Sequence, residues 1–397
     1  MAKKNISGNE AVANALRQIN PDVMAAFPIT PSTEIPQYFS KFVSDGKVTT
    51  EFIPVESEHS SMSATIGAEA AGARAVTATS SCGLAYMWEP LTLAASNRLP
   101  CALMLVCRAL SGPININCDH SDAMAARDTG WIQIFSENNQ EAYDNAVMAF
   151  RISEHKDVRL PIMICQDGFI TSHAVGVMEM LSDQEVKDFV GEYEPEHYLL
   201  NENEPMALGP YAISPYYMEA RRAQEQAMEN AKQVILDVSR EFAEMSGRSY
   251  GLFEEYALED ADVAIVLIGS AAGTAKDAVD EMREKGLKVG LLKIRVFRPF
   301  PADEIAKALK NVKVIGLMDR SESFSTQGGP LISEVSAALF KNRVQAQAVN
   351  YMYGLGGRDI TVEMFEEIFE ELLAVSEGKD PIVKESGRAY RYIGLRE

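Results

Sequence analysis

The sequence predicts an α/β fold with two mainly parallel sheets, and three observations support that prediction. Short apolar segments alternate with segments of helical periodicity over residues 8–166 and again after residue 256. A chain of 397 residues is too long for one ordinary core and fits two or three domains. Its composition, 47% hydrophobic and 24% charged, is typical of a soluble globular protein.

The first half of the chain is predicted to contain alternating helices and strands. Thr30 follows the second of these elements and is expected to cap a helix whose first residue is Pro31. The expected helices are Gly8–Ile19, Pro31–Phe42, Ser57–Ala73, Cys82–Ser96 and Asn139–Arg151. The expected strands are Val23–Phe27, Phe52–Val55, Ala75–Ser80, Cys101–Cys107 and Pro161–Gln166.

The second half is predicted to form an independent domain after a linker. Residues 178–256 are acidic and aromatic at first and then form one long polar helix, about Met218–Met245, read as an arm that packs across the surface. A helix, Ser270–Lys285, then lies among four parallel strands: Asp262–Gly269, Lys288–Val296, Val312–Asp319 and Gln347–Tyr353. We expect domains at 1–195 and 257–397, joined by 196–256.

Charge and cysteine content exclude several classes of function. A net charge of -20 disfavours nucleic acid as a partner, since phosphate binding needs clustered Lys and Arg. No apolar run reaches 18 residues and no secretory segment opens the chain, so neither a membrane span nor export is expected. The five cysteines form no C-x-x-C, which favours reduced thiols in the cytoplasm and disfavours an iron–sulfur cluster bound by this chain alone.

Thr30 is the first candidate for a binding residue. Pro28 and Pro31 restrict the backbone around it, so its hydroxyl has little freedom. Beside the free N–H groups of a helix start, that hydroxyl suits a carboxylate or a phosphate. An ordinary helix cap is the alternative explanation of the same segment.

Glu56 and Glu58 are the candidate acids. They lie two residues apart after a strand and before a helix of small residues. Either carboxylate could serve only as a cap, because the helix dipole stabilises an acid there. In a functional site, one of them would be directed at the ring nitrogen of a heteroaromatic cofactor.

Arg108 follows an apolar strand and suits the carboxylate of a small 2-oxoacid, although an internal ion pair would explain it equally well. Residues 109–118 are interpreted as a loop over the site, in which Ile114 and Ile116 alternate and could line a small apolar pocket. The nearby residues Asp119, His120 and Asp122 are too few and too loosely spaced to predict a metal site.

Two motifs are absent from the chain. It has no Gly-Asp-Gly segment of the kind that holds Mg²⁺ and a diphosphate in thiamine enzymes, and no glycine-rich nucleotide motif opens a strand–helix unit. The glycine-rich segment Gly354–Asp359 follows the last strand, and we expect it to form a turn before a helix that Thr361 begins.

Several segments together resemble the alpha subunit of the 2-oxoacid:ferredoxin oxidoreductases, above all pyruvate:ferredoxin oxidoreductase. The match covers nearly the whole chain, with Phe27 standing where the family commonly has Tyr. The segments that carry it are Gly8–Ala11, Phe27–Pro31, Pro54–Ser60, Thr77–Ser80, Arg108–Ala109, Arg127–Trp131, Glu137–Glu141, Phe297–Phe300 and Gly354–Asp359.

The resemblance implies a thiamine diphosphate enzyme divided among subunits. This chain would be the pyrimidine-side domain followed by a transketolase C-terminal-like domain. Glu58 would be the catalytic acid that meets the pyrimidine, with Pro28 beside the cofactor, and Thr30 and Arg108 would bind the substrate carboxylate. A beta subunit would supply the Mg²⁺ and diphosphate site with a nearby iron–sulfur cluster, and gamma and delta subunits would supply further clusters and contacts to coenzyme A.

The implied reaction converts pyruvate and coenzyme A to acetyl-CoA and CO₂ and reduces ferredoxin. One alternative is the same chemistry on another 2-oxoacid, such as 2-oxoisovalerate, phenylglyoxylate or oxalate. Oxalate is disfavoured because the turn at Thr30 contains no arginine. The other alternative is a non-catalytic scaffold subunit whose motifs are only caps and turns.

Overall fold

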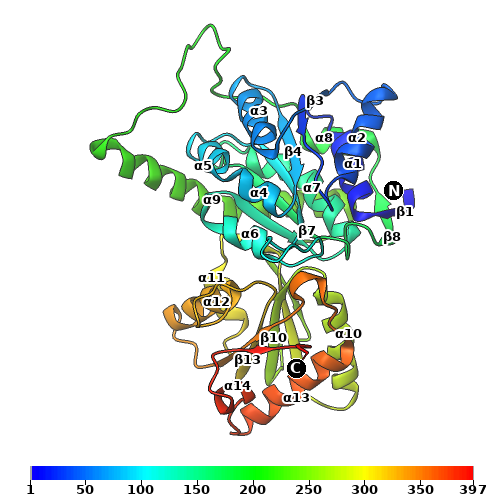
Figure 1. Cartoon of the computed structure of the whole chain (residues 1–397), viewed down its shortest axis with the longest axis vertical. Helices are drawn as coiled ribbons and strands as arrows, with labels where there is room; N and C mark the ends of the chain where they lie inside the picture. The colour runs from blue at the N-terminus through cyan, green and yellow to red at the C-terminus, as the bar shows by residue number, and fades with distance from the viewer. Residues whose placement is uncertain (1, 397) are drawn as a thin grey trace.

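The computed structural model describes residues 2–396 and contains one large sheet in each half of the chain (Figure 1). The first sheet has seven strands in the order β12-β6-β7-β5-β4-β2-β3, all parallel except β12. Its strands are β2 (Val23–Ala26), β3 (Glu51–Pro54), β4 (Ala75–Thr79), β5 (Ala102–Cys107), β6 (Ile132–Ser136), β7 (Ile162–Asp167) and β12 (Val296–Arg298).

The second sheet has six strands in the order β15-β14-β13-β10-β11-β9. The four predicted parallel strands form its centre, and an antiparallel strand, β9, lies at one edge. Its strands are β9 (Phe253–Tyr256), β10 (Val263–Ile268), β11 (Val289–Ile294), β13 (Val314–Asp319), β14 (Gln347–Met352) and β15 (Arg391–Tyr392). The fold class expected from the sequence, α/β with parallel sheets, is confirmed.

Helices cover both faces of each sheet, as parallel sheets require. In the first half they are α1 (Gly8–Ile19), α2 (Glu34–Ser44), α3 (Glu58–Ala70), α4 (Cys82–Tyr86), α5 (Trp88–Ser96), α6 (Ser121–Ala125), α7 (Asn139–Ser153), α8 (Asp183–Val190) and α9 (Ser214–Ser246). In the second half they are α10 (Ala271–Glu284), α11 (Ala302–Ala308), α12 (Pro330–Lys341), α13 (Val362–Ser376) and α14 (Ile382–Glu385). Thr361 caps α13 by accepting a hydrogen bond from the backbone N–H of Met364, as expected.

The two halves share an apolar core. Leu103 and Leu105 on β5 belong to the same buried cluster as Val266 on β10 and Leu292 on β11. Helices α11 and α12 contribute to that cluster as well, through Ile305 and other residues. Burial of apolar surface between the sheets therefore stabilises the arrangement of the two halves.

Several strands were missed from the sequence. A small antiparallel sheet of β1 (Ala2–Ser7) and β8 (Val175–Met180) was not expected, and neither were β6, β9 and β15. The strand predicted over Lys288–Val296 is confirmed, but it is shorter than expected. That segment contains β11, which ends at Ile294, and it leads into β12, which crosses to the first sheet and pairs with β6.

Helix α9 belongs to the first core only along its later part. Residues 214–223 at its start are exposed, and Figure 1 shows this end and the preceding loop extending away from the body of the molecule. Farther along, Ala231, Ile235 and Phe242 are buried in the cluster that includes α1 and α7. The predicted surface arm is therefore anchored by a buried stripe.

Among residues 2–396, no helix combines the length and the apolar composition needed to cross a lipid bilayer.

Replacing Phe242 with Ala should destabilise the protein by about 3–5 kcal/mol, because it removes a fully buried ring from α9. Its ring packs edge-on against Phe189, with centroids 5.5 Å apart. Tyr217→Ala on the exposed start of the same helix is the matched control and should change stability by no more than about 0.5 kcal/mol. Urea unfolding of both variants measures the difference, and equal losses would contradict the anchoring of α9.

Candidate functional site

The predicted site residues come from segments that follow the parallel strands of the first sheet. Thr30 follows β2, Glu58 follows β3, and Arg108 directly follows β5. The carboxyl ends of parallel strands meet at one edge of a sheet, where ligands of α/β proteins bind. The guanidinium of Arg108 donates a hydrogen bond from Nη1 to the backbone oxygen of Thr30 at 2.9 Å, which brings two of the predicted residues together.

Thr30 does not cap a helix, so that part of the prediction is wrong. Helix α2 begins at Glu34, and Thr33 occupies the cap position. The backbone N–H of Ser32 donates to the oxygen of Ile29 at 2.9 Å, and this tight turn delays the start of the helix. Thr30 and Pro28 are both exposed on the resulting turn.

The two glutamates lie in different environments. Glu56 is exposed and accepts a hydrogen bond from the hydroxyl of Ser60 at 2.6 Å, which holds its pKa below the usual range. Glu58 is the first residue of α3 and is partly buried. Ser57 caps this helix by accepting from the N–H of Ser60, so capping does not require either glutamate side chain.

Glu58 points toward the start of α4, where a glycine leaves room for it. A Cβ atom added to Gly83 would lie 3.0 Å from Glu58 Oε1 and 2.4 Å from Thr79 Oγ1. The hydroxyls of Thr79 and Ser80 are buried and have no hydrogen-bond partner among the described residues. Buried hydroxyls normally find a partner, so each of these two can form a further hydrogen bond.

Asp122 joins two of the site segments. Its carboxylate accepts hydrogen bonds from the backbone N–H groups of Ser81 at 2.8 Å and Arg108 at 3.0 Å, and from Ala123 at 2.7 Å. Burial raises the pKa of Asp122 to about 7, while the three N–H donors oppose that shift. Asp122 thus fixes the loop after β4 against the loop after β5.

Arg108 is buried, and its guanidinium hydrogen-bonds backbone oxygens within the described part of the chain. Besides the bond to Thr30, its Nε donates to the backbone oxygen of Asn115 at 3.0 Å. Both acceptors are neutral carbonyls, so the positive charge is not neutralised by a carboxylate. A buried guanidinium in this state is suited to bind an anion.

The loop after Arg108 carries its two isoleucines on the surface. Ile114 is 77% exposed and Ile116 is 47% exposed. The structure therefore places them beside the site without enclosing them in a pocket of this chain.

Some residues of the site were not singled out from the sequence. Gly83 and the unpaired hydroxyl of Thr79 matter because of their approach to Glu58, which is a tertiary contact. The only local signal is the run of small residues Ser80–Gly83 directly after a buried strand. Ser81 in this run has a φ angle of 48°, a strained value for a residue with a side chain.

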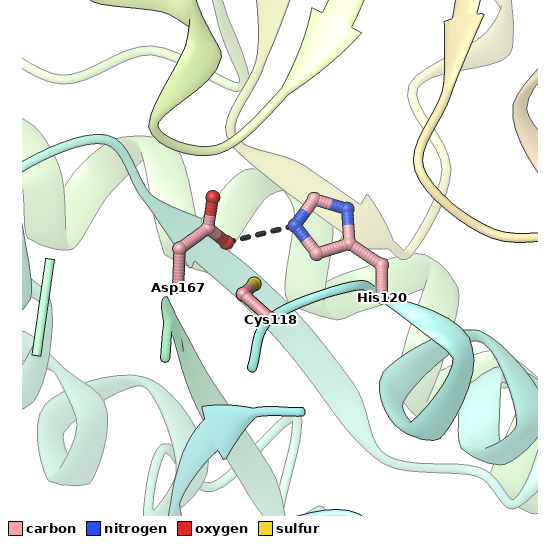
Figure 2. Close-up of side chains that lie close together, drawn as sticks. All are labelled: Cys118, His120 and Asp167. Carbon is pink, nitrogen blue, oxygen red and sulfur yellow. Dashed lines mark hydrogen bonds and ion pairs between the residues drawn. The ribbon is translucent and has the colours of Figure 1, made fainter. Parts of the chain in front are cut away.

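A second polar cluster is buried next to the end of the loop formed by residues 109–118. His120 Nε2 lies 2.8 Å from Asp167 Oδ1, and Figure 2 shows Cys118 beside this pair. Candidate ligand atoms of these three residues lie within 4.8 Å of one another. Burial alone would raise the pKa of Asp167, but the adjacent His120 and Arg320 hold it below its usual range.

Two family descriptions match the chain. The thiamine diphosphate-binding domain of pyruvate flavodoxin/ferredoxin oxidoreductase matches residues 14–240, and core domain II of pyruvate:ferredoxin oxidoreductase matches residues 261–365. The chain belongs to the pyruvate:ferredoxin oxidoreductase family. The resemblance expected from the sequence motifs is thereby confirmed.

Individual relatives in this family are similar over nearly their full length. The pyruvate synthase subunit PorA of Thermotoga maritima is 52% identical over 99% of this chain and 98% of its own. The ketoisovalerate oxidoreductase subunit VorA of Pyrococcus abyssi is 43% identical over 94% of each chain.

A solved structure shares the fold of this family. The 2-oxoglutarate:ferredoxin oxidoreductase from Magnetococcus marinus, with 2-oxoglutarate, coenzyme A and succinyl-CoA bound, superposes with a TM-score of 0.75 at 20% identity. The match covers 94% of this chain and 65% of that one.

Replacing Gly83 with Ala should destabilise the protein by about 1–3 kcal/mol, because the new methyl group would overlap Thr79 Oγ1 and press on Glu58. Gly67→Ala in α3 is the control: it has open space around it and should stabilise that helix by about 0.5–1 kcal/mol. Thermal unfolding of the two variants measures both effects. If Gly83→Ala is as stable as the native protein or more stable, the contact around Gly83 is not tight.

Proposed function

We propose that this chain is the alpha subunit of a thiamine diphosphate-dependent oxidoreductase that converts pyruvate and coenzyme A to acetyl-CoA and CO₂. The electron pair left when the carboxylate departs would pass to ferredoxin. The observation that carries the proposal is the position of Glu58 against Gly83, close to the buried hydroxyl of Thr79, which has no partner among the described residues. The 52% identity to a pyruvate synthase subunit supports the choice of pyruvate.

The residues around Glu58 fit the pyrimidine end of the cofactor. A carboxylate can hydrogen-bond a protonated ring nitrogen, and the free hydroxyls of Thr79 and Ser80 can each donate or accept. The absence of a side chain on Gly83 lets Glu58 and Thr79 approach the start of α4, since a Cβ atom there would lie 3.0 Å from Glu58 Oε1 and 2.4 Å from Thr79 Oγ1. When bound, thiamine diphosphate supplies the electron sink for decarboxylation. Glu58 would hold the proton at the ring nitrogen that it contacts.

Arg108 and Thr30 would bind the substrate carboxylate. The guanidinium is already oriented by the carbonyl groups of Thr30 and Asn115, so little side-chain entropy remains to be lost on binding. The hydroxyl of Thr30 is exposed on the adjacent turn. We retain Ile114 and Ile116 as residues that contact the substrate, and Pro28 as a cofactor contact.

A partner chain is needed to complete this site. The chain has no Gly-Asp-Gly segment for Mg²⁺ and diphosphate, and large apolar side chains stay exposed nearby, including Tyr86 and Trp88 on α4 and α5. We propose that a beta subunit covers this surface and supplies the metal and diphosphate site. Gamma and delta subunits or their equivalents would carry further iron–sulfur clusters and contacts to coenzyme A and ferredoxin.

We also propose a division into residues 1–195, a linker at 196–256 and a C-terminal domain at 257–397. The two large sheets support it, since most strands of each come from one segment. Strand β12 and helix α9 join the segments across these boundaries. A cytoplasmic location is supported by five free cysteines, four of them buried.

The purified complex should reduce a viologen dye in the presence of pyruvate, coenzyme A and thiamine diphosphate. Omitting any one of the three should abolish the reaction. A second candidate substrate is 2-oxoisovalerate, because one relative is a ketoisovalerate oxidoreductase subunit. Comparing kcat/KM for pyruvate, 2-oxobutyrate and 2-oxoisovalerate decides between them, and a higher value for 2-oxoisovalerate would overturn the choice of pyruvate.

Glu58→Gln should slow the reaction by about 10²–10⁴-fold, the usual contribution of a positioned acid or base. Glu56→Gln is the matched control and should leave the rate nearly unchanged, because Glu56 is exposed and its carboxylate accepts a hydrogen bond from the neighbouring Ser60. The initial rate of dye reduction gives the result, and the thiamine content of each complex shows whether binding is intact. A loss confined to Glu56→Gln would mean that the two roles are reversed.

A further inference from the structure

The polar cluster at Asp167 joins the two halves of the molecule. Asp167 ends β7 of the first sheet, and its Oδ2 accepts hydrogen bonds from Arg320 Nη1 at 2.9 Å and from Ser270 Oγ at 2.5 Å. Arg320 directly follows β13, and Ser270 occupies the position before α10, so both partners come from the second half. Together with His120, these residues are called the interdomain cluster.

Ion pairing explains the interdomain cluster better than a metal does. His120 forms a hydrogen bond with Oδ1 of Asp167, while Arg320 and Ser270 donate hydrogen bonds to Oδ2. Both carboxylate oxygens therefore already have partners. The guanidinium also places a positive charge where a cation would have to bind. Burial raises the pKa of the nearby Cys118 thiol well above its usual value, which disfavours the thiolate that a metal needs.

From Arg320, a series of hydrogen bonds leads toward Arg108. Arg320 Nε donates to the backbone oxygen of Gly354 at 3.2 Å. Two residues farther along the same loop, the oxygen of Gly356 accepts from Asn115 Nδ2 at 3.0 Å. The backbone oxygen of Asn115 in turn accepts from Arg108 Nε at 3.0 Å.

The glycine-rich loop can make these contacts because the residues at the contact points, Gly354 and Gly356, have no side chains. Gly354 and Gly356 have φ angles of 64° and 61°, which favour glycine. A Cβ atom would lie 2.8 Å from Arg320 Nε at Gly354 and 2.4 Å from Asn115 Nδ2 at Gly356. The loop is therefore shaped to lie between the interdomain cluster and the loop that follows Arg108.

A second contact fixes the far end of the Arg108 loop to Arg320. The backbone N–H of His120 donates to the backbone oxygen of Arg320 at 2.9 Å. Asp119 Oδ2 accepts from the N–H of Gly356 at 3.2 Å. Both ends of the segment between Asn115 and His120 are thus held by the second half of the chain.

We propose that Arg320 is a positioning residue for Arg108: it fixes the glycine-rich loop, which orders residues 109–118 and so orients the guanidinium for the substrate carboxylate. The proposal rests on the function proposed above for Arg108. The second half of the chain then contributes to substrate binding without contacting the substrate.

Two substitutions in the intact complex test this proposal. Arg320→Lys keeps a positive charge beside Asp167 but loses the planar group that also reaches Gly354. Asn115→Asp keeps the acceptor for the N–H of Asn117 but loses the donor to Gly356. This second variant keeps the proposal testable if the substitution of the buried Arg320 prevents folding. Lys276→Gln is the control. Lys276 Nζ forms an ion pair with Glu137 in the other half at 3.0 Å, and this pair includes no residue of the glycine-rich loop or of residues 109–118.

Two measurements are made on each complex. Amide hydrogen exchange over residues 109–118, without substrate, should accelerate in Arg320→Lys and Asn115→Asp and stay native in Lys276→Gln. The KM for the 2-oxoacid should rise about 10-fold or more in the first two variants, the size of a lost charge-assisted hydrogen bond, with unchanged thiamine content. The control should keep its KM.

Several results would overturn the proposal. Native exchange in the loop of both variants would show that the interdomain cluster does not order it, and faster exchange with an unchanged KM would show that the order does not serve substrate binding. One zinc ion per chain that is lost in Cys118→Ala would assign the cluster to a metal instead. A native complex without 2-oxoacid activity would refute the proposed function separately, because hydrogen exchange is measured without turnover.

Discussion

The buried carboxylate of Asp167 is the interaction on which the relation between the two halves depends. It lies at the carboxyl end of a central strand. There it forms hydrogen bonds with His120, Arg320 and the backbone N–H and hydroxyl of Ser270, the residue before α10. A charge this deeply buried is stable only with such compensation. Because Arg320 and Ser270 come from the second half, the halves cannot change their relative position without breaking the hydrogen bonds to Asp167 Oδ2. The apolar cluster between the sheets holds the halves together but does not define their orientation so specifically.

The incomplete part of the site is as informative as the part that is present. Glu58 is directed inward, Arg108 lacks a carboxylate partner, and two buried hydroxyls have none among the described residues. Each of these features costs free energy in an isolated protein. They occur together at the carboxyl edge of one sheet, next to exposed apolar side chains. This combination supports the proposed binding site that is shared with a partner subunit.

Much of the fold was predictable because periodicity and turn residues act locally. The four central strands of the second sheet are mostly apolar, although β11 contains Lys293 and β14 contains Asn350, and their assignment from the sequence was correct. The strand β6 was missed, although Ile132–Ser136 is buried throughout, because it is short and follows an irregular segment. The crossing of β12 to the other sheet could not be predicted, since nothing local to Val296–Arg298 indicates which edge it will pair with. For the same reason, the motif residues at the site were found while Gly83 and the unpaired hydroxyl of Thr79 were not.

The pairing of β12 with β6 also constrains how the chain reaches its native state. The first sheet obtains this edge strand from a segment more than 150 residues farther along, as the register of Val296 with Ile134 shows. During synthesis, the N-terminal half leaves the ribosome with the β6 edge of its largest sheet unpaired. Such an edge is a template for association with other chains. A chain cut in the segment before β9 would therefore yield an N-terminal fragment with an open edge, rather than a self-contained domain.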